Sequence, residues 1–152
     1  MTTWNYPLRE NVILAPYTSF QIGGPADFFA EVETPEELTD LIQEAQSKKI
    51  RFFILGGGSN TLFHENGFRG LIIRPIFRKI TVDGNRITAE AGALLSQLVS
   101  KAVENSFAGI EGWIGLPGTV GGAIRGNAGA SGIEVKNVLV HAHIFDIQEN
   151  EF

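Results

Sequence analysis

The chain has no cysteine among its 152 residues. This absence excludes disulfides, thiolate zinc sites and cysteine nucleophiles, and it is typical of a reducing compartment. Charged residues are scarce at 19%, and 12 Lys and Arg against 17 Asp and Glu give a net charge of −5. An acidic surface repels polyanions, so we expect neither nucleic acid nor an anionic membrane as a main partner.

Long apolar runs are also missing. No stretch approaches the 18 or more apolar residues of a membrane span, and residues 1–11 lack the continuous apolar run of a signal peptide. We therefore expect a cytoplasmic protein. The chain does contain 43% hydrophobic residues and 18 glycines. It can therefore bury a core while many backbone positions turn sharply or approach another group closely.

The first half of the chain is typical of an α/β unit. Thr34-Pro35-Glu36-Glu37 predicts a helix start, because Thr34 can cap, Pro35 suits the first helical position and Glu37 can close a capping box. The apolar run 50–55 predicts a buried strand, and residues 26–32 and 70–74 predict two more. The order is therefore expected to be β-α-β-loop-β.

The second half predicts a hairpin followed by a helix. Residues 79–91 contain two short strands around the turn Asp83-Gly84-Asn85. A helix is expected over 94–106, with an inner stripe of Leu95, Leu98, Val99, Ala102 and Val103. Residues 109–132 contain nine glycines, which we interpret as a chain of turns. Residues 138–147 predict a final strand, with nothing for its far edge to meet.

A glycine-rich loop, Gly56-Gly57-Gly58-Ser59-Asn60, follows the predicted strand at 50–55. Such a loop can direct several backbone N–H groups toward an anion, and Ser59, Asn60 and Thr61 add short side-chain donors that favour phosphate. No lysine follows the glycines as in a P-loop, and Thr61 occupies the last glycine position of G-x-G-x-x-G. Glycine content alone is equally compatible with a tight turn that needs positive φ.

A second glycine-rich loop spans residues 116–123, with the sequence Leu116-Pro117-Gly118-Thr119-Val120-Gly121-Gly122-Ala123. It leads to Asn127-Ala128-Gly129-Ala130-Ser131-Gly132. Neither stretch carries bulky side chains, so a flat ring could lie directly on the backbone. A tightly packed cluster of turns is the alternative. Two such loops in a small protein favour a dinucleotide ligand over a mononucleotide.

The histidines and Arg125 are weaker candidates. His141 and His143 would face the same side of a strand, but no acidic residue is spaced to complete a metal site, so we expect no metal. His64 beside Glu65 is interpreted as a loop pair in preference to an acid/base dyad. Arg125, among glycines, could meet a phosphate or be solvated.

Four linked motifs together carry a family resemblance. They are residues 18–27 (TSFQIGGPAD), 55–62 (LGGGSNTL), 109–112 (GIEG), and 116–123 with 127–132. In this order and spacing the chain resembles the UDP-N-acetylenolpyruvoylglucosamine reductase family, also called UDP-N-acetylmuramate dehydrogenase. The match covers nearly the whole chain and is closer to the shorter of the family's two types.

The resemblance implies an FAD-binding fold of the vanillyl-alcohol-oxidase type, in the α/β and α+β class, with FAD held non-covalently between two subdomains. Residues 1–75 would form the first subdomain and residues 76–152 an incomplete second one, with the substrate-binding domain absent. The family's reaction uses NADPH to reduce the flavin and then the enolpyruvyl group of a UDP-sugar, giving UDP-N-acetylmuramate for peptidoglycan.

The resemblance also assigns the cofactor-binding residues. The pyrophosphate of FAD would lie on residues 56–61, with residues 18–24 lining the same cleft. The flavin ring would lie near residues 118–123 and 127–129. The expected contacts are Gly56, Gly57, Gly58, Ser59, Asn60, Thr61, Thr18, Ile22, Gly23, Pro117, Gly118, Thr119, Val120, Gly121, Gly122, Ala123, Asn127 and Gly129.

Two departures from the family pattern affect the function. Ser131 stands where the family usually has Tyr, and the family's catalytic residues would lie beyond Phe152. We therefore expect this chain alone not to complete the reaction. Two alternatives stay open: a catalytically inactive nucleotide-binding or FAD-binding module, and another oxidoreductase of the same fold. A covalent flavin is disfavoured, because neither glycine loop contains His or Cys.

Overall fold

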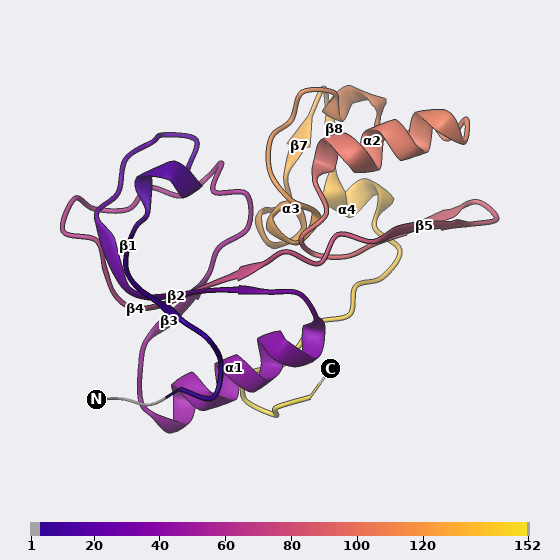
Figure 1. The fold of residues 1–152 in the computed structure, drawn as a ribbon. Coiled ribbons are helices and arrows are strands. Elements are labelled where there is room, and N and C mark those ends of the chain that lie inside the picture. The colour runs from indigo at the N-terminus through magenta and orange to yellow at the C-terminus, as the bar shows by residue number, and fades with distance from the viewer. Residues whose placement is uncertain (1–3, 152) are drawn as a thin grey trace. The chain divides into compact units, whose positions relative to one another are not determined.

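The computed structural model describes residues 4–151, which form two compact units, Met1–Phe77 (unit 1) and Arg78–Phe152 (unit 2). Unit 1 contains a four-stranded sheet and unit 2 two two-stranded sheets (Figure 1). Each unit has its own buried core. Among the helices of the described part, none is long and apolar enough to cross a bilayer.

Unit 1 is built on a four-stranded sheet in the order β1-β2-β4-β3. Strand β1 (Arg9–Ile13) pairs antiparallel with β2 (Pro25–Val32), whereas β2 and β3 (Phe52–Ile54) both run parallel to β4 (Phe68–Pro75). The predicted strands at 26–32 and 70–74 are confirmed, and β1 was not predicted. A short 3-10 helix, η1 (Ala15–Tyr17), follows β1.

Helix α1 (Pro35–Ser47) packs against β2 and β4 (Figure 1). Its predicted start is confirmed, because the Thr34 hydroxyl accepts a hydrogen bond from the Glu37 N–H at 3.1 Å. The Glu37 carboxylate accepts from the Glu33 N–H at 2.7 Å, one residue earlier than a capping box requires. Side chains alternate along β4, so Ile72 faces away from α1 and joins the core of unit 1. This buried cluster consists of Leu14, Ala26, Phe29, Leu55, Phe63 and Ile72, and Leu41, Ile42, Ala45, Leu71 and Ile73 are buried in unit 1 as well.

Strand β3 exists as predicted, but the prediction that it is buried is wrong. Phe53 and Ile54 are each 38% exposed, because β3 lies at the edge of the sheet and pairs only with β4. An apolar run therefore indicated a strand correctly without indicating its place in the sheet.

Unit 2 begins with the predicted hairpin, β5 (Ile80–Asp83) paired antiparallel with β6 (Arg86–Ala89). Helix α2 (Leu95–Glu104) confirms the predicted helix, although Val103 is 59% exposed and does not belong to the inner stripe. Helix α2 packs against the 3-10 helix η2 (Glu111–Trp113) and against α3 (Val120–Gly126). The core of unit 2 consists of Ala93, Leu95, Val99, Trp113, Val120, Ala123 and Val135.

Two predictions for unit 2 are wrong. The glycine-rich stretch 109–132 is not simply a chain of turns, because it contains η2, α3 and strand β7 (Gly129–Ala130), which pairs with β8 (Ile133–Glu134). The strand predicted over 138–147 is replaced by the end of α4 (Val135–Val138) and an extended stretch. A strand needs a ladder of hydrogen bonds, and within residues 4–151 this stretch forms only an isolated bridge, Asp146 to Glu151.

Candidate functional site

The first glycine loop, residues 56–61, begins where β3 leaves the sheet. The Leu55 N–H still donates to the Ile73 carbonyl of β4, at 2.8 Å, and the chain then departs from the ladder. The loop therefore lies at the carboxyl end of a parallel pair of strands. This is the edge at which α/β sheets commonly bind ligands.

Gly58 brings this loop against residues 17–19. Its φ is +67°, and a Cβ added there would lie 2.0 Å from the Tyr17 carbonyl oxygen, so no side chain fits. The Gly58 carbonyl in turn accepts a hydrogen bond from the Ser19 N–H at 3.1 Å. The structure thus brings together two of the segments that the sequence predicted to share a site.

Five N–H groups of the first glycine loop make no backbone–backbone hydrogen bond within the described residues. They belong to Gly56, Gly57, Gly58, Asn60 and Thr61. Consecutive unpaired backbone donors form an anion-binding concavity, because each N–H must find an acceptor in solvent or in a ligand. This property fits a phosphate group and requires no cationic side chain.

Two of the three predicted contacts in the segment before β2, Thr18 and Gly23, stabilise the local fold. Thr18 is buried, and its hydroxyl lies 3.3 Å from each of the Ala15 and Ile22 carbonyls, so it closes the turn of its own segment. Gly23 has φ +149°, and a Cβ there would lie 3.0 Å from the Phe63 Cβ. Ile22 is 53% exposed and is the one of the three whose side chain is open to a ligand.

The second glycine loop was predicted over residues 116–123, and its last four residues form the first turn of α3. Thr119 is buried and caps this helix, its hydroxyl accepting from the Gly122 N–H at 3.4 Å. The N–H groups of Val120 and Gly121 donate to the Ala93 and Ala91 carbonyls at 2.8 and 2.9 Å. These three N–H groups are therefore engaged within the unit, and a flat ligand would meet chiefly a surface without side chains.

Close packing explains part of the glycine content. A Cβ on Gly121 would lie 2.9 Å from the Ala91 Cβ, whereas one on Gly122 would meet only the Thr119 hydroxyl at 3.3 Å. Gly122 and Gly129 are exposed, and Pro117 is exposed at the start of the loop. Gly118 has φ +117°, a backbone conformation that favours glycine.

Asn127 ends α3 in the left-handed conformation, with φ 45° and ψ 47°. Its side-chain amide donates to the Glu134 carboxylate at 3.0 Å, and its carbonyl oxygen accepts from the Lys136 N–H at 3.0 Å. The side chain therefore ties the end of α3 to Glu134 of β8 and to Lys136 of α4. Ser131, the departure from the family pattern, lies exposed at the tip of this hairpin with φ 54°.

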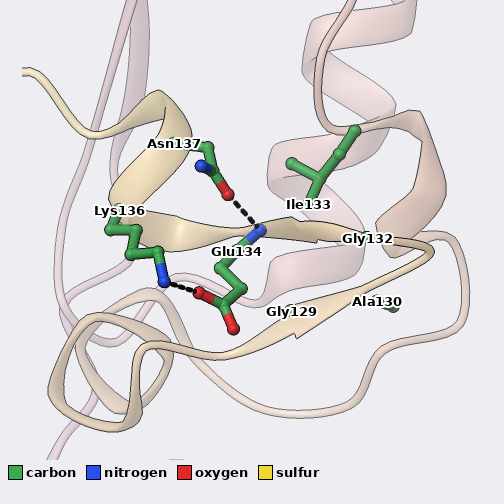
Figure 2. A pocket seen from close by; sticks show the side chains of 7 residues that line it. All are labelled: Gly129, Ala130, Gly132, Ile133, Glu134, Lys136 and Asn137. Atoms are coloured by element: carbon green, nitrogen blue, oxygen red, sulfur yellow. Dashed lines mark hydrogen bonds and ion pairs between the residues drawn. The ribbon is translucent and has the colours of Figure 1, made fainter.

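A pocket of about 360 Å³ opens beside this hairpin (Figure 2). It is lined by Gly129, Ala130, Gly132, Ile133, Glu134, Lys136 and Asn137. The Lys136 ammonium pairs with the Glu134 carboxylate, and the side-chain oxygen Oδ1 of Asn137 accepts a hydrogen bond from the Glu134 N–H at 2.8 Å. The hydrogen bonds from Lys136 and then Asn127 lower the pKa of Glu134, which keeps this carboxylate ionised.

The weaker candidates do not assemble into a site. His64 Nδ1 accepts from the Asn66 N–H at 3.0 Å, which supports its interpretation as a loop residue. The rings of His141 and His143 lie 5.9 Å apart, but no group of three or more metal-ligating residues occurs in the described part of the chain. Arg125 is exposed in the last turn of α3.

Three residues that shape the glycine loops were not predicted. Tyr17 meets the first glycine loop through its carbonyl group, and Ala91 and Ala93 accept hydrogen bonds from the N–H groups at the start of α3. The pattern Ala91-Gly92-Ala93 was a usable signal, because three small residues in a row permit a close backbone approach. A main-chain partner such as the Tyr17 carbonyl leaves no comparable signal in the sequence.

Comparison with known proteins gives a consistent result. The family described as "FAD binding domain" matches residues 26–148. The UDP-N-acetylenolpyruvoylglucosamine reductase of Caldanaerobacter subterraneus is 44% identical over 144 residues, covering 94% of this chain and 48% of that protein. The reductase of the same name from Carboxydothermus hydrogenoformans is 44% identical over 135 residues, covering 88% and 45%.

A solved structure shows the same similarity. The crystal structure of UDP-N-acetylenolpyruvylglucosamine reductase from Thermus caldophilus matches with a TM-score of 0.67 and 37% identity, covering 84% of this chain and 45% of that one. The chain spans about half the length of the curated relatives it matches. These similarities confirm the resemblance found in the sequence and the predicted α/β fold of FAD-binding type.

Proposed function

This chain belongs to the FAD binding domain family, and from that premise we propose that it is the flavin-binding portion of an NADPH-dependent reductase. The reaction proposed for the whole enzyme converts the enolpyruvyl ether of UDP-N-acetylglucosamine to UDP-N-acetylmuramate, a step of peptidoglycan precursor synthesis. The curated relatives carry the corresponding name.

One observation supports the cofactor most directly. The first glycine loop presents N–H groups that no backbone carbonyl within residues 4–151 accepts, and Gly58 holds the loop where a Cβ would collide with the Tyr17 carbonyl. A pyrophosphate needs this kind of main-chain cradle, since the net charge of the chain provides no general attraction for anions. We assign the pyrophosphate of FAD to residues 56–61.

The second glycine loop and the residues after it are proposed to carry the flavin ring. Gly122 and Gly129 are exposed without side chains, while Thr119 and Asn127 hold the local backbone in place. When bound, FAD supplies the transfer of a hydride from NADPH to the enolpyruvyl double bond. The residues of this chain would bind and orient the cofactor, and no residue of the chain is proposed to donate the proton.

The UDP-sugar and the proton donor are proposed to belong to the part of the relatives' length that this chain does not span. The chain as given would then bind FAD without completing turnover. On this proposal the chain is an FAD-binding module, and the reductase activity belongs to the whole enzyme. We further propose that the flavin is bound non-covalently, because neither glycine loop offers a histidine or cysteine.

The test is the visible absorption spectrum of the folded chain after incubation with FAD and removal of free ligand. We expect a protein-bound flavin band, and we expect acid precipitation to release the flavin into the supernatant. A folded chain that retains no flavin would refute the cofactor assignment. If this chain alone oxidised NADPH when the enolpyruvyl sugar nucleotide is present, the proposal that it binds FAD without completing turnover would be refuted.

A further inference from the structure

The side chain of Tyr17 is held between an aromatic ring and two arginines on unit 1. Its ring lies on Phe29 of β2, with 4.6 Å between ring centroids and 37° between ring planes. The guanidinium carbon of Arg74 is 5.3 Å from the centre of the Tyr17 ring, and that of Arg9 is 6.0 Å away. At these distances a cation is attracted to the face of an aromatic ring.

The two arginines are themselves held in place by one carboxylate. Glu31 accepts from Arg74 at 2.9 Å and from Arg9 at 3.3 Å. Arg9, Glu31 and Arg74 lie on three adjacent strands, where Glu31 is paired in register with Arg74. We call Tyr17, Phe29, Arg9, Arg74 and Glu31 the tyrosine clamp.

The main chain of Tyr17 meets the first glycine loop. A Cβ on Gly58 would lie 2.0 Å from the Tyr17 carbonyl oxygen and 3.0 Å from the Thr18 Cα, and the Ser19 N–H donates to the Gly58 carbonyl at 3.1 Å. The ring and this carbonyl belong to one residue. Whatever fixes the ring therefore fixes the surface against which the loop is packed.

We propose that Tyr17 is a positioning residue for cofactor binding: the tyrosine clamp holds residues 17–19, and thereby the first glycine loop, so that the loop's five N–H groups without a backbone acceptor are in place for the pyrophosphate. Tyr17 does this without contacting FAD. The inference rests on the proposed FAD function and adds to it a residue outside both glycine loops. Preorganised donors bind more tightly, since no ordering free energy is lost on binding.

The test compares three variants of the whole chain: Tyr17→Ala, Tyr17→Phe and Phe28→Ala. Tyr17→Phe keeps the ring and removes only the hydroxyl. Phe28→Ala is the matched control, because Phe28 neighbours Phe29 on β2, points to the opposite face of the sheet and packs with Trp4 at 5.4 Å between centroids. Flavin fluorescence gives the Kd for FAD, and amide hydrogen exchange reports on residues 56–61.

We expect Tyr17→Ala to weaken FAD binding about tenfold, equivalent to about 1.4 kcal/mol, and to speed exchange in residues 56–61. Tyr17→Phe and Phe28→Ala should stay within about twofold of the unsubstituted chain. Tyr17→Ala binding as tightly as the unsubstituted chain would overturn the inference. So would an equal loss in Phe28→Ala, because general destabilisation would then explain both.

Two further outcomes remain decisive. If Tyr17→Ala does not fold, Arg74→Gln replaces it, and an unchanged Kd in that variant would overturn the inference whereas a weaker one supports it. If the unsubstituted folded chain binds no FAD, the proposed function fails separately. The exchange of residues 56–61 then decides whether Tyr17 positions the loop, with faster exchange in Tyr17→Ala than in Phe28→Ala as the supporting result.

Discussion

Replacing Gly58 with alanine should destabilise unit 1 more than the change of one methyl group suggests. Its φ of +67° is costly for a residue with a Cβ, about 1–2 kcal/mol. The new Cβ would also lie 2.0 Å from the Tyr17 carbonyl oxygen and must retreat by roughly 1 Å to reach the closest contacts that real Cβ atoms make. That retreat breaks the hydrogen bond from Ser19 to Gly58, which contributes about 1 kcal/mol.

The expected loss for Gly58→Ala is therefore about 2–3 kcal/mol of the free energy of unfolding of unit 1. Gly84→Ala is the control, because Gly84 also has positive φ, +56°, but nothing lies within 4 Å of its added Cβ. It should lose only the backbone strain, about 1–2 kcal/mol, and so less than Gly58→Ala by the contribution of the broken hydrogen bond. Native-state hydrogen exchange measures both, read on peptides of β4 for unit 1 and of α2 for unit 2. Equal losses in the two variants would refute the argument from close approach.

Three further predictions test other local arguments. Thr34→Ala should lower the free energy of unfolding by about 1 kcal/mol in urea titrations, because it removes the cap of α1; no change would show that the cap is dispensable. Gly121→Ala should destabilise unit 2, since its Cβ would lie 2.9 Å from the nearest carbon, whereas Gly122→Ala should be neutral or stabilising by up to about 1 kcal/mol through helix propensity; the opposite order in thermal unfolding would contradict this. The pKa of Glu134 is lowered by Lys136, so its contribution to stability is present above the ordinary carboxyl range and is lost as pH falls through the folded value. Glu134→Gln should flatten that part of the acid unfolding curve of unit 2, and an unchanged curve would count against the ion pair.

The sequence predicted those elements whose signals are local. Helix α1 was predictable because Thr34 and Pro35 mark its start and apolar residues follow at helical spacing. The β5–β6 hairpin was predictable from its turn residues. The first glycine loop lies where the sequence predicted it, whereas residues 120–123 of the second belong to α3, and which residues of either contact FAD stays a prediction.

Features that depend on distant partners could not be predicted. Helix α3 lies in a glycine-rich stretch of low helix propensity, and it forms with help from the Thr119 cap and the carbonyls of Ala91 and Ala93. Residues 138–147 have the composition of a strand, yet Val140 and Ile144 are 70% and 69% exposed and no described strand pairs with them. Side-chain periodicity is visible in a sequence, whereas the supply of hydrogen-bond partners is not.

The link between the segments before α2 and α3 has a consequence for folding kinetics. The Leu95 N–H donates to the Gly118 carbonyl at 3.0 Å, the Val120 N–H donates to the Ala93 carbonyl at 2.8 Å, and Leu94 bridges to Thr119. These bonds close a loop that contains α2 and η2. The entropy of closing a loop grows only with the logarithm of its length, and contacts close in sequence form fastest. We therefore expect the β5–β6 hairpin, whose paired residues are close in sequence, to form first, and the longer closure between the segments before α2 and α3 to follow as one cooperative step.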